Sequence, residues 1–362
     1  MNKNKGDYMI NLKKVGLTAL AGSLAAVTAQ AGELSVTGSA NVTYVTKSGD
    51  NTAQSLGHDK DVKFSGSGEL DNGFTFSLFT NMKDSFDVSS SATVITMGSL
   101  GSIGVGSGGG TNINGAYDEA IPTAYEENSD AGGQGVANYV GSYADGNGVT
   151  YIFPAMDVMG ATVTGGVDYS FQGGSDSPND GGAVARSSTW GNAYGVGLTL
   201  AYEGLSVGAF VSEMENTNPT ANKTIEDEMH ASWNVKYSAG PVSIGYSESY
   251  QDQGLTGGAT ATTTAKTVRS ANGIFESETI SIAFNVNDNL SVSYTETEDT
   301  YDAQDNAATA VSDVTMDTDA MQIAYSMGGM SIKAYNMDTT NPGYDSDAAS
   351  GSATEIALGL SF

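Results

Sequence analysis

The sequence contains no cysteine, six prolines and few charged residues, which make up 15% of the chain. Disulfides and thiolate metal sites are therefore excluded, and stability must come from elsewhere. A run of about 18 apolar residues, the length that spans a bilayer as a helix, is also absent, which excludes a helical membrane protein. Lys and Arg number 14 against 42 Asp and Glu, a net charge of −28. This balance argues against a nucleic-acid partner, because neutralising phosphates requires clusters of Lys and Arg.

The start of the chain has the layout of an export signal. Four lysines precede an apolar stretch from Val15 to Val27, and Ala29-Gln30-Ala31 supplies the small-x-small pattern of a cleavage site. We therefore expect residues 1–31 to be a signal peptide and residues 32–362 to form the mature protein. The alternative is a membrane-anchoring helix, which the shortness of the apolar run disfavours.

The rest of the chain repeats one pattern, the period-two alternation of β-strands with one apolar and one polar face. In the first such segment Leu34 and Val36 alternate with Ser35 and Thr37. Spaced apolar residues of this kind also argue against disorder. Sixteen strands are expected, over residues 33–47, 58–70, 73–86, 92–99, 102–108, 148–156, 160–171, 187–202, 204–214, 229–239, 241–252, 274–287, 289–300, 317–327, 329–339 and 353–362.

Short and long connections alternate between these segments. Tight turns such as Gly240 alternate with long polar loops such as 253–273. In an up-and-down antiparallel sheet this places all short turns at one end, as in an outer-membrane barrel. The sheet must close, because an open edge in hydrocarbon leaves backbone groups without partners. Sixteen strands enclose a lumen wide enough for an aqueous channel.

Aromatic residues at the strand ends fit the two interfacial girdles of such a barrel, although ordinary strand propensity is an alternative reason for them. Those beside the turns are Phe74, Tyr202 and Tyr237, and those nearer the loops are Tyr44, Tyr169 and Phe171.

The chain has a signal peptide, sixteen amphipathic strands and a final strand "ATEIALGLSF" that ends in Phe362. In these features it resembles the Gram-negative general porins, and most of all those of alphaproteobacteria. "TMGSLGSIGVGSGGG" is similar to their fourth and fifth strands, which lead into a long third loop. The resemblance implies an all-β transmembrane antiparallel β-barrel with that loop folded into the lumen. It also implies a homotrimer in the outer membrane, recognition of Phe362 by the barrel-assembly machinery, and passive diffusion of small hydrophilic solutes and ions.

The segment 108–147 is the candidate functional loop, because connections of about 40 residues are usually functional or disordered. It contains no Lys or Arg. By resemblance its carboxylates, with Asp118, Glu119, Glu126 and Glu127 first, ring the pore constriction and attract cations. The alternative is an acidic lid outside the barrel. The carboxylates are Asp118, Glu119, Glu126, Glu127, Asp130 and Asp145.

Porin constrictions set basic residues on the wall opposite the loop. Four lysines fall on the polar face of expected strands: Lys63 and Lys83, which match the basic wall, and Lys236 and Lys333 elsewhere in the lumen. The departure from the family pattern is the absence of an Arg cluster, since Arg186 and Arg269 are the only arginines. A weak basic wall predicts a more cation-selective pore.

Other signals are weaker. Acidic clusters such as Glu226-Asp227-Glu228 are competent oxygen ligands for Ca²⁺ or Mg²⁺, which could bridge to anionic lipopolysaccharide, but none has EF-hand spacing. No cofactor is expected beyond such loosely bound ions. His58 and His230 have no partners for a zinc site, and no nucleophile–base pair indicates an enzyme.

The alternatives to a general porin are a substrate-specific outer-membrane channel and, less favoured, a surface β-adhesin.

Overall fold

The structure is a computed structural model, which describes residues 34–50, 52–84, 87–107, 111–118, 120–128, 148–171, 190–216, 224–225, 227–252, 255–256, 273–303 and 313–362. The expected signal peptide lies outside these ranges. In the part of the chain that is described, no helix combines the length and the apolar character needed to cross a bilayer. The two helices described are single 3-10 turns, η1 (Gly98–Leu100) and η2 (Asn114–Ala116).

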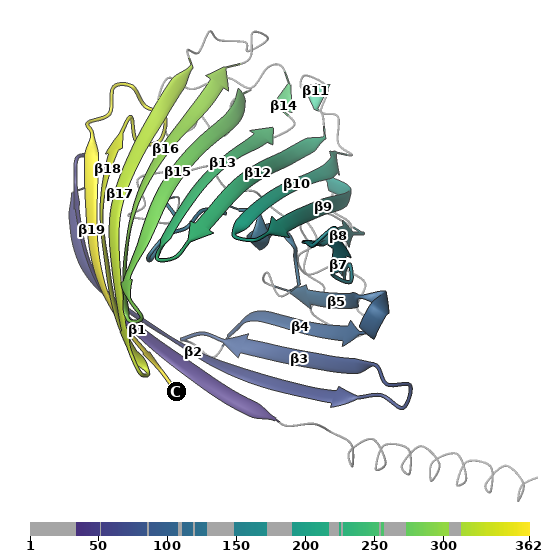
Figure 1. Ribbon diagram of the computed structural model, residues 1–362. Helices are drawn as coiled ribbons and strands as arrows, with labels where there is room; N and C mark the ends of the chain where they lie inside the picture. The colour runs from purple at the N-terminus through teal and green to yellow at the C-terminus, as the bar shows by residue number, and fades with distance from the viewer. Residues whose placement is uncertain are drawn as a thin grey trace, which may run out of the picture.

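Strands account for nearly all of the remaining described structure (Figure 1). A two-residue pair, β11 (Thr224–Ile225) and β14 (Leu255–Thr256), forms a separate small sheet. The strands of the main sheet are β1 (Ser35–Ser48), β2 (Ala53–Glu69), β3 (Thr75–Met82), β4 (Val88–Thr96), β5 (Ser102–Ser107), β6 (Gly148–Ile152), β7 (Met156–Val158), β8 (Ala161–Ser170), β9 (Trp190–Tyr202), β10 (Leu205–Asn216), β12 (Glu228–Ala239), β13 (Val242–Asp252), β15 (Gly273–Asn287), β16 (Leu290–Ala303), β17 (Val314–Met327), β18 (Met330–Thr340) and β19 (Gly351–Ser361).

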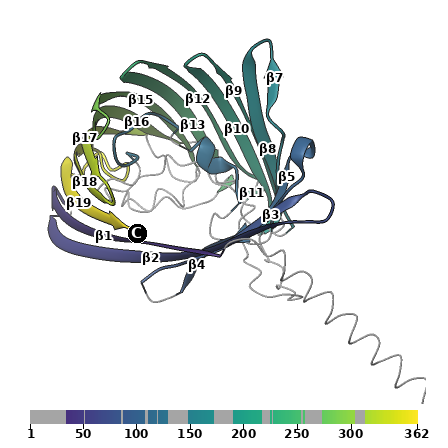
Figure 2. The same cartoon turned by 60° about the horizontal axis from the view of Figure 1, so that its bottom comes forward.

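The main sheet closes into a ring. Each strand pairs antiparallel with its neighbours in sequence, and β1 pairs with both β2 and β19 (Figure 2). β6 and β7 both pair with β8 and are separated by residues 153–155. This break includes Pro154, which has no N–H for a ladder hydrogen bond. β6 and β7 are therefore one interrupted strand, and the barrel has the sixteen strands that were predicted.

The barrel has two different rims. The connections after β2, β4, β7, β9, β12, β15 and β17 are short and form the turn rim, whereas the connections at the opposite end, most of them longer, form the loop rim. Gly240 and Gly328 occupy two of the tight turns with φ of 58° and 59°, in the left-handed region that glycine enters without steric cost. The predicted sorting of connections is thus confirmed for the described strands.

Alternate residues of each strand face opposite sides of the wall. In β17, Thr318, Ala320 and Gln322 are buried, whereas Met321 and Ile323 are exposed. The exposed face is apolar along most of the ring, as expected for contact with lipid. Part-way along the strands it carries four aromatic residues that were not assigned to a girdle from the sequence, namely Tyr194, Trp233, Tyr246 and Tyr294.

Above these aromatic residues the outward face becomes strongly acidic. Cross-strand partners share a face, so the register places carboxylates directly opposite one another in two lines, which we call the acidic rows. Tyr294 Oη donates to Asp319 Oδ1 at 2.6 Å, which links the aromatic level to the rows. The upper row is Glu248, Glu278, Glu298 and Asp317, and the lower row is Glu296, Asp319 and Asp338.

The acidic rows lead to a prediction about stability. Glu298 lies between Glu278 and Asp317, so Glu298→Gln removes two like-charge contacts. We expect a gain of roughly 0.2–1 kcal/mol in the free energy of unfolding at neutral pH. Thermal unfolding of the barrel in detergent at low salt measures this gain. The matched control is Glu69→Gln, because Glu69 faces Thr75; an equal gain in the control would contradict the repulsion.

The last residue completes the seam between β1 and β19. Phe362 and Gly38 exchange two backbone hydrogen bonds of 3.0 Å. The Phe362 ring lies where a side chain on Gly38 would be, since a Cβ built on Gly38 falls 2.3 Å from Phe362 Cζ. The ring therefore covers the glycine on the outward face, in line with the exposed Leu358 and Leu360.

Candidate functional site

The segment between β5 and β6 is described over residues 111–118 and 120–128, and we call these residues the inner segment. Its hydrogen bonds go to inward-facing side chains of β8, β9, β12, β15, β16, β17 and β19. The inner segment therefore follows the inner face of the wall around half of the ring (Figure 2).

The inner segment begins at a buried carboxylate. Asp168 of β8 is 2% exposed, and its Oδ2 accepts the backbone N–H of Ile113 at 3.0 Å. Its Oδ1 accepts the Thr150 hydroxyl at 2.6 Å. A buried charge is costly unless it is hydrogen-bonded. Asp168 thus fixes the start of the inner segment and is itself fixed by Thr150.

Tyr117 anchors the middle of the inner segment. Its ring stacks on Phe210 of β10 with centroids 5.5 Å apart and an interplanar angle of 16°. The Ser232 hydroxyl donates to the Tyr117 carbonyl at 3.1 Å. The ring also occupies the space over Gly197 of β9, where a Cβ would lie 2.3 Å from Tyr117 Cε2. Only glycine at position 197 leaves room for this ring.

A second wall glycine has the same role further along. A Cβ on Gly245 of β13 would lie 2.3 Å from Pro122 Cδ. Beside it, the Ser281 hydroxyl donates to the Pro122 carbonyl at 2.9 Å. The inner segment can therefore lie directly against the strand backbone, close enough for short serine and threonine side chains to hold it.

Gln322 of β17 holds the end of the inner segment. Its Oε1 accepts the backbone N–H of Tyr125 at 2.8 Å and of Glu126 at 3.1 Å, and its Nε2 donates to the Glu126 carbonyl at 2.6 Å. Gln322 is 3% exposed. A single buried amide therefore satisfies three backbone groups, each of which is expensive to leave unpaired.

The Tyr125 side chain reaches β18 and β19. Its hydroxyl donates to Glu355 Oε1 at 2.6 Å, and Lys333 Nζ lies 4.9 Å from the ring centroid. Burial, followed by the hydrogen bond to Glu355, raises the pKa of Tyr125 above its ordinary value. Tyr125 therefore stays protonated and remains a donor to Glu355 at physiological pH.

The predicted carboxylates are placed as follows. Asp118, Glu126 and Glu127 belong to the inner segment and are partly exposed. Asp118 N–H donates to the Asn114 carbonyl at 2.9 Å, which closes η2. Glu119, Asp130 and Asp145 lie outside the described residues.

The predicted lysines divide into two groups. Lys63, Lys236 and Lys333 lie on the inward face, opposite Thr37, Ser206 and Ala357. Lys63 Nζ lies 4.1 Å above the Phe79 ring centroid. Lys83 follows the end of β3 at the loop rim, where its N–H donates to the Asp87 carbonyl. Lys83 comes two residues after Asn81, the cross-strand partner of Lys63.

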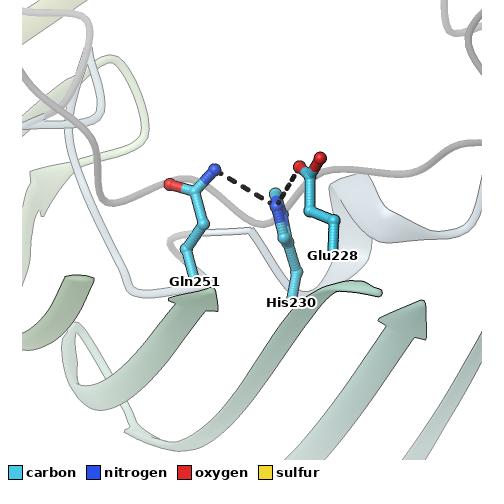
Figure 3. A network of polar contacts seen from close by, with 3 residues as sticks. All are labelled: Glu228, His230 and Gln251. Carbon is cyan, nitrogen blue, oxygen red and sulfur yellow. Dashed lines mark hydrogen bonds and ion pairs between the residues drawn. The ribbon is translucent and has the colours of Figure 1, made fainter. Parts of the chain in front are cut away.

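A further polar network lies nearer the loop rim (Figure 3). His230 of β12 is 1% exposed, and its Nε2 lies 3.1 Å from both Glu228 Oε1 and Gln251 Nε2. With a proton on Nε2 the imidazole donates to the Glu228 carboxylate. Among the described residues no group of three His, Asp or Glu side chains is placed to hold a metal ion.

The anchors Asp168, Gln322 and Glu355 were not identified from the sequence. Asp168 and Gln322 are polar residues between outward apolar or aromatic neighbours, as Gln322 is between Met321 and Ile323, whereas Glu355 lies between Thr354 and Ile356. That spacing could have marked the first two as inward. The partners of all three anchors, however, lie up to 230 residues away in the chain, so the spacing could not have shown what they bind.

The family model described as Gram-negative porin matches residues 16–312, which is most of the chain. The chain belongs to the Gram-negative porin family. The protein is therefore an outer-membrane channel protein and not an enzyme, as predicted. No curated protein sequence matches it.

Solved porins share the fold at low sequence identity. Salmonella typhi OmpF, in a complex with daunomycin, has a TM-score of 0.66 and 14% identity, covering 91% of this chain and 98% of that chain. A porin refined at 1.8 Å resolution has a TM-score of 0.59 and 14% identity over 91% of this chain and 100% of its own. A loop-deletion mutant of OmpT from Vibrio cholerae has a TM-score of 0.58 and 11% identity, covering 91% and 99%.

Proposed function

We propose that this porin forms a water-filled, cation-selective channel for the passive diffusion of small hydrophilic solutes and ions, with the inner segment as its constriction. The observation that carries the proposal is the hydrogen-bonded path of the inner segment from Asp168 to Gln322. A segment held along the wall narrows the lumen and brings the carboxylates of Asp118, Glu126 and Glu127 beside the solute path. Charged side chains at a narrow, low-dielectric passage select ions by sign.

The charges of the wall support selection for cations. Inward-facing acidic residues of the described strands outnumber the inward lysines. The lysines are Lys47, Lys63, Lys236 and Lys333, and the acidic residues are Asp59, Asp61, Glu69, Asp157, Asp168, Glu228, Asp299 and Glu355.

Space beside the inner segment supports an open passage. A hollow of about 390 Å³ lies next to its end and is lined by Glu126, Lys333 and Asn41 among others. Another, of about 610 Å³, lies against β1 to β4 and includes Asp61 and Lys63. Mixed charges and amides at these positions suit hydrated solutes.

A general channel is favoured over a substrate-specific one. A track of exposed aromatic rings along the lumen would favour a specific channel. Phe210 and Tyr335 face inward, but both are buried, with Phe210 against Tyr117 and Tyr335 against Tyr125. Phe79 also faces inward and is partly exposed, but Lys63 lies over its ring. A single ring of this kind does not make a track for a solute.

Reversal potentials in a salt gradient test the proposal. Wild-type protein in a planar bilayer should show stepwise conductance and a cation-selective reversal potential. Glu126→Gln combined with Glu127→Gln should move that potential toward zero, because two negative charges leave the constriction. The matched control is Glu298→Gln with Asp317→Asn, which removes two charges from the outward acidic rows.

Two results would contradict the proposal. Absence of conductance from heat-modifiable, folded protein would exclude an open channel. Anion selectivity in the wild type, or an equal shift in the control pair, would exclude an acidic constriction in the inner segment.

We also propose that the porin assembles as a homotrimer through the outward face of β2 to β4. This face carries polar side chains at outward positions, whereas the outward positions of most other strands are apolar. The polar residues include His58, Lys60 and Thr93. Lys60 Nζ and Asp84 Oδ1 lie 3.6 Å apart there. Hydrocarbon is a poor solvent for such groups, whereas a second copy can pair with them. Lys60→Leu should shift the complex to monomers on semi-native gels.

Three further partners belong to the proposal. The loop-rim carboxylates, such as Asp345 and Asp347, would hold Ca²⁺ or Mg²⁺ loosely and bridge to lipopolysaccharide. The barrel-assembly machinery would recognise the final strand through Phe362. The position of Phe362 at the closing seam is consistent with a signal that is read when the last strand is present.

A further inference from the structure

A lipid-facing groove runs over β12, β13, β15 and β16. It encloses about 480 Å³ and is lined by Val235, Ile244, Ile280 and Ile282, by the rings of Tyr237, Tyr246 and Tyr294, and by Glu296 on its β16 side. These residues all belong to the outward face, so the groove opens toward the membrane. Its size and its mostly apolar walls suit part of an acyl chain.

A second outward hollow, of about 290 Å³, lies next to the groove on β12, β13 and β15, toward the loop rim. On each of these three strands, the first outward residue beyond the groove lines the hollow. Trp233 follows Val235 in this way, and Glu278 follows Ile280. The outward side chains of this hollow are Ala231, Trp233, Glu248, Tyr250, Glu276 and Glu278.

The hollow combines aromatic faces with fixed carboxylates. Trp233 Nε1 donates to Glu248 Oε2 at 2.8 Å, and Tyr246 Oη donates to Glu248 Oε1 at 2.6 Å. Glu278 lies directly opposite Glu248 in the register. Among the described residues no lysine lies on the outward face of these strands. The site is therefore built for positive charge, which aromatic faces also attract.

We propose that this face docks a membrane lipid with a cationic ammonium headgroup. One acyl chain lies in the groove, and the ammonium group lies in the hollow between Trp233, Tyr250 and the carboxylates of Glu248 and Glu278. The charge of the hollow selects this occupant, because a phosphate-bearing anionic headgroup at the same height meets three carboxylates.

Lipid retention by the folded, full-length porin tests the proposal. Three dioleoyl probes that differ only in headgroup are used, namely trimethylammonium-propane, phosphocholine and phosphoglycerol. Native mass spectrometry counts the lipids retained after detergent exchange in EDTA. The trimethylammonium lipid should be retained about fivefold more than the phosphocholine lipid, the ratio expected of about 1 kcal/mol for one charge at an oppositely charged surface.

Variants locate the binding site. Glu248→Gln with Glu278→Gln should abolish the preference for the trimethylammonium lipid. Asp317→Asn with Asp338→Asn should preserve it, because these two residues belong to the acidic rows but line neither the groove nor the hollow. Ile282→Trp fills the groove and should lower retention of the trimethylammonium lipid with all carboxylates present. Heat-modifiable gel migration shows that each variant is folded.

Three outcomes would overturn the proposal. The first is equal retention of the three headgroups by the wild type. The second is an equal loss of preference in the Asp317 and Asp338 pair, which would indicate diffuse charge and no site. The third is a preference for the phosphoglycerol lipid when Ca²⁺ replaces EDTA, which would assign the face to cation-bridged anionic lipid.

Discussion

Gly197→Val is expected to displace the inner segment and to replace the single open level of the channel with several sublevels. A valine side chain occupies the space of the Tyr117 ring, whose Cε2 lies 2.3 Å from the Cβ position. Overpacking of this kind costs about 1–3 kcal/mol. That corresponds to a factor of roughly 5–150 in the occupancy of the wall-bound position. Single-channel recording in a planar bilayer measures the sublevels.

The matched control is Gly66→Val, because a Cβ on Gly66 meets only ordinary contacts with the Leu78 side chain at 3.7 Å. This control lies on the outward face, away from the inner segment, and should keep one conductance level. A wild-type trace from Gly197→Val in folded protein would show that Tyr117 does not hold the segment.

Gln322→Leu is expected to release the end of the inner segment and to weaken cation selectivity. Leucine has a similar size but leaves two N–H groups and one carbonyl of the segment without partners, at about 1–3 kcal/mol each when buried. Glu126 then leaves its fixed position beside Lys333. We expect larger, noisier conductance and a reversal potential closer to zero, measured in the same salt gradient as the charge variants.

Gln322→Glu separates this hydrogen-bonding role from simple packing. An ionised carboxylate still accepts from Tyr125 and Glu126, but it cannot donate to the Glu126 carbonyl and sets a negative oxygen against it. The variant should therefore loosen the segment at neutral pH, although less than Gln322→Leu does. A protonated carboxyl has both a donor and an acceptor, so behaviour close to the wild type should return as pH falls through the pKa of the introduced carboxyl group. If acidification leaves the variant unchanged, the donor of Gln322 is not what holds the segment.

The barrel itself was predictable from the sequence because its determinants are local. Period-two alternation, as in Ile356, Leu358 and Leu360, depends only on strand geometry, and all three residues are exposed on the outward face. The interruption at Pro154 was not predicted, because the apolar pattern continues through it. Only the pairing of both β6 and β7 with β8 identifies them as one strand.

The anchors of the inner segment and the acidic rows needed information that periodicity lacks. The sequence shows that Gln322 faces inward but not that Tyr125, 197 residues earlier, lies against it. In the same way Glu248, Glu278 and Glu298 look like isolated acidic residues in separate strands. Only the register, set by the turns and by packing around the whole ring, brings them opposite one another.

The seam between β1 and β19 has a consequence for biogenesis. Every other pair of neighbouring strands in the barrel is also consecutive in the sheet along the chain, so those strands can pair one after another. At this seam, Ser48 and Ser352 form a hydrogen bond although they are 304 positions apart. Both edges of the growing sheet therefore stay unpaired until the final residues arrive, and exposed edges invite pairing with other chains. A nascent or half-exported chain cannot reach the native state, so something must shield its two open edges until Phe362 has been delivered.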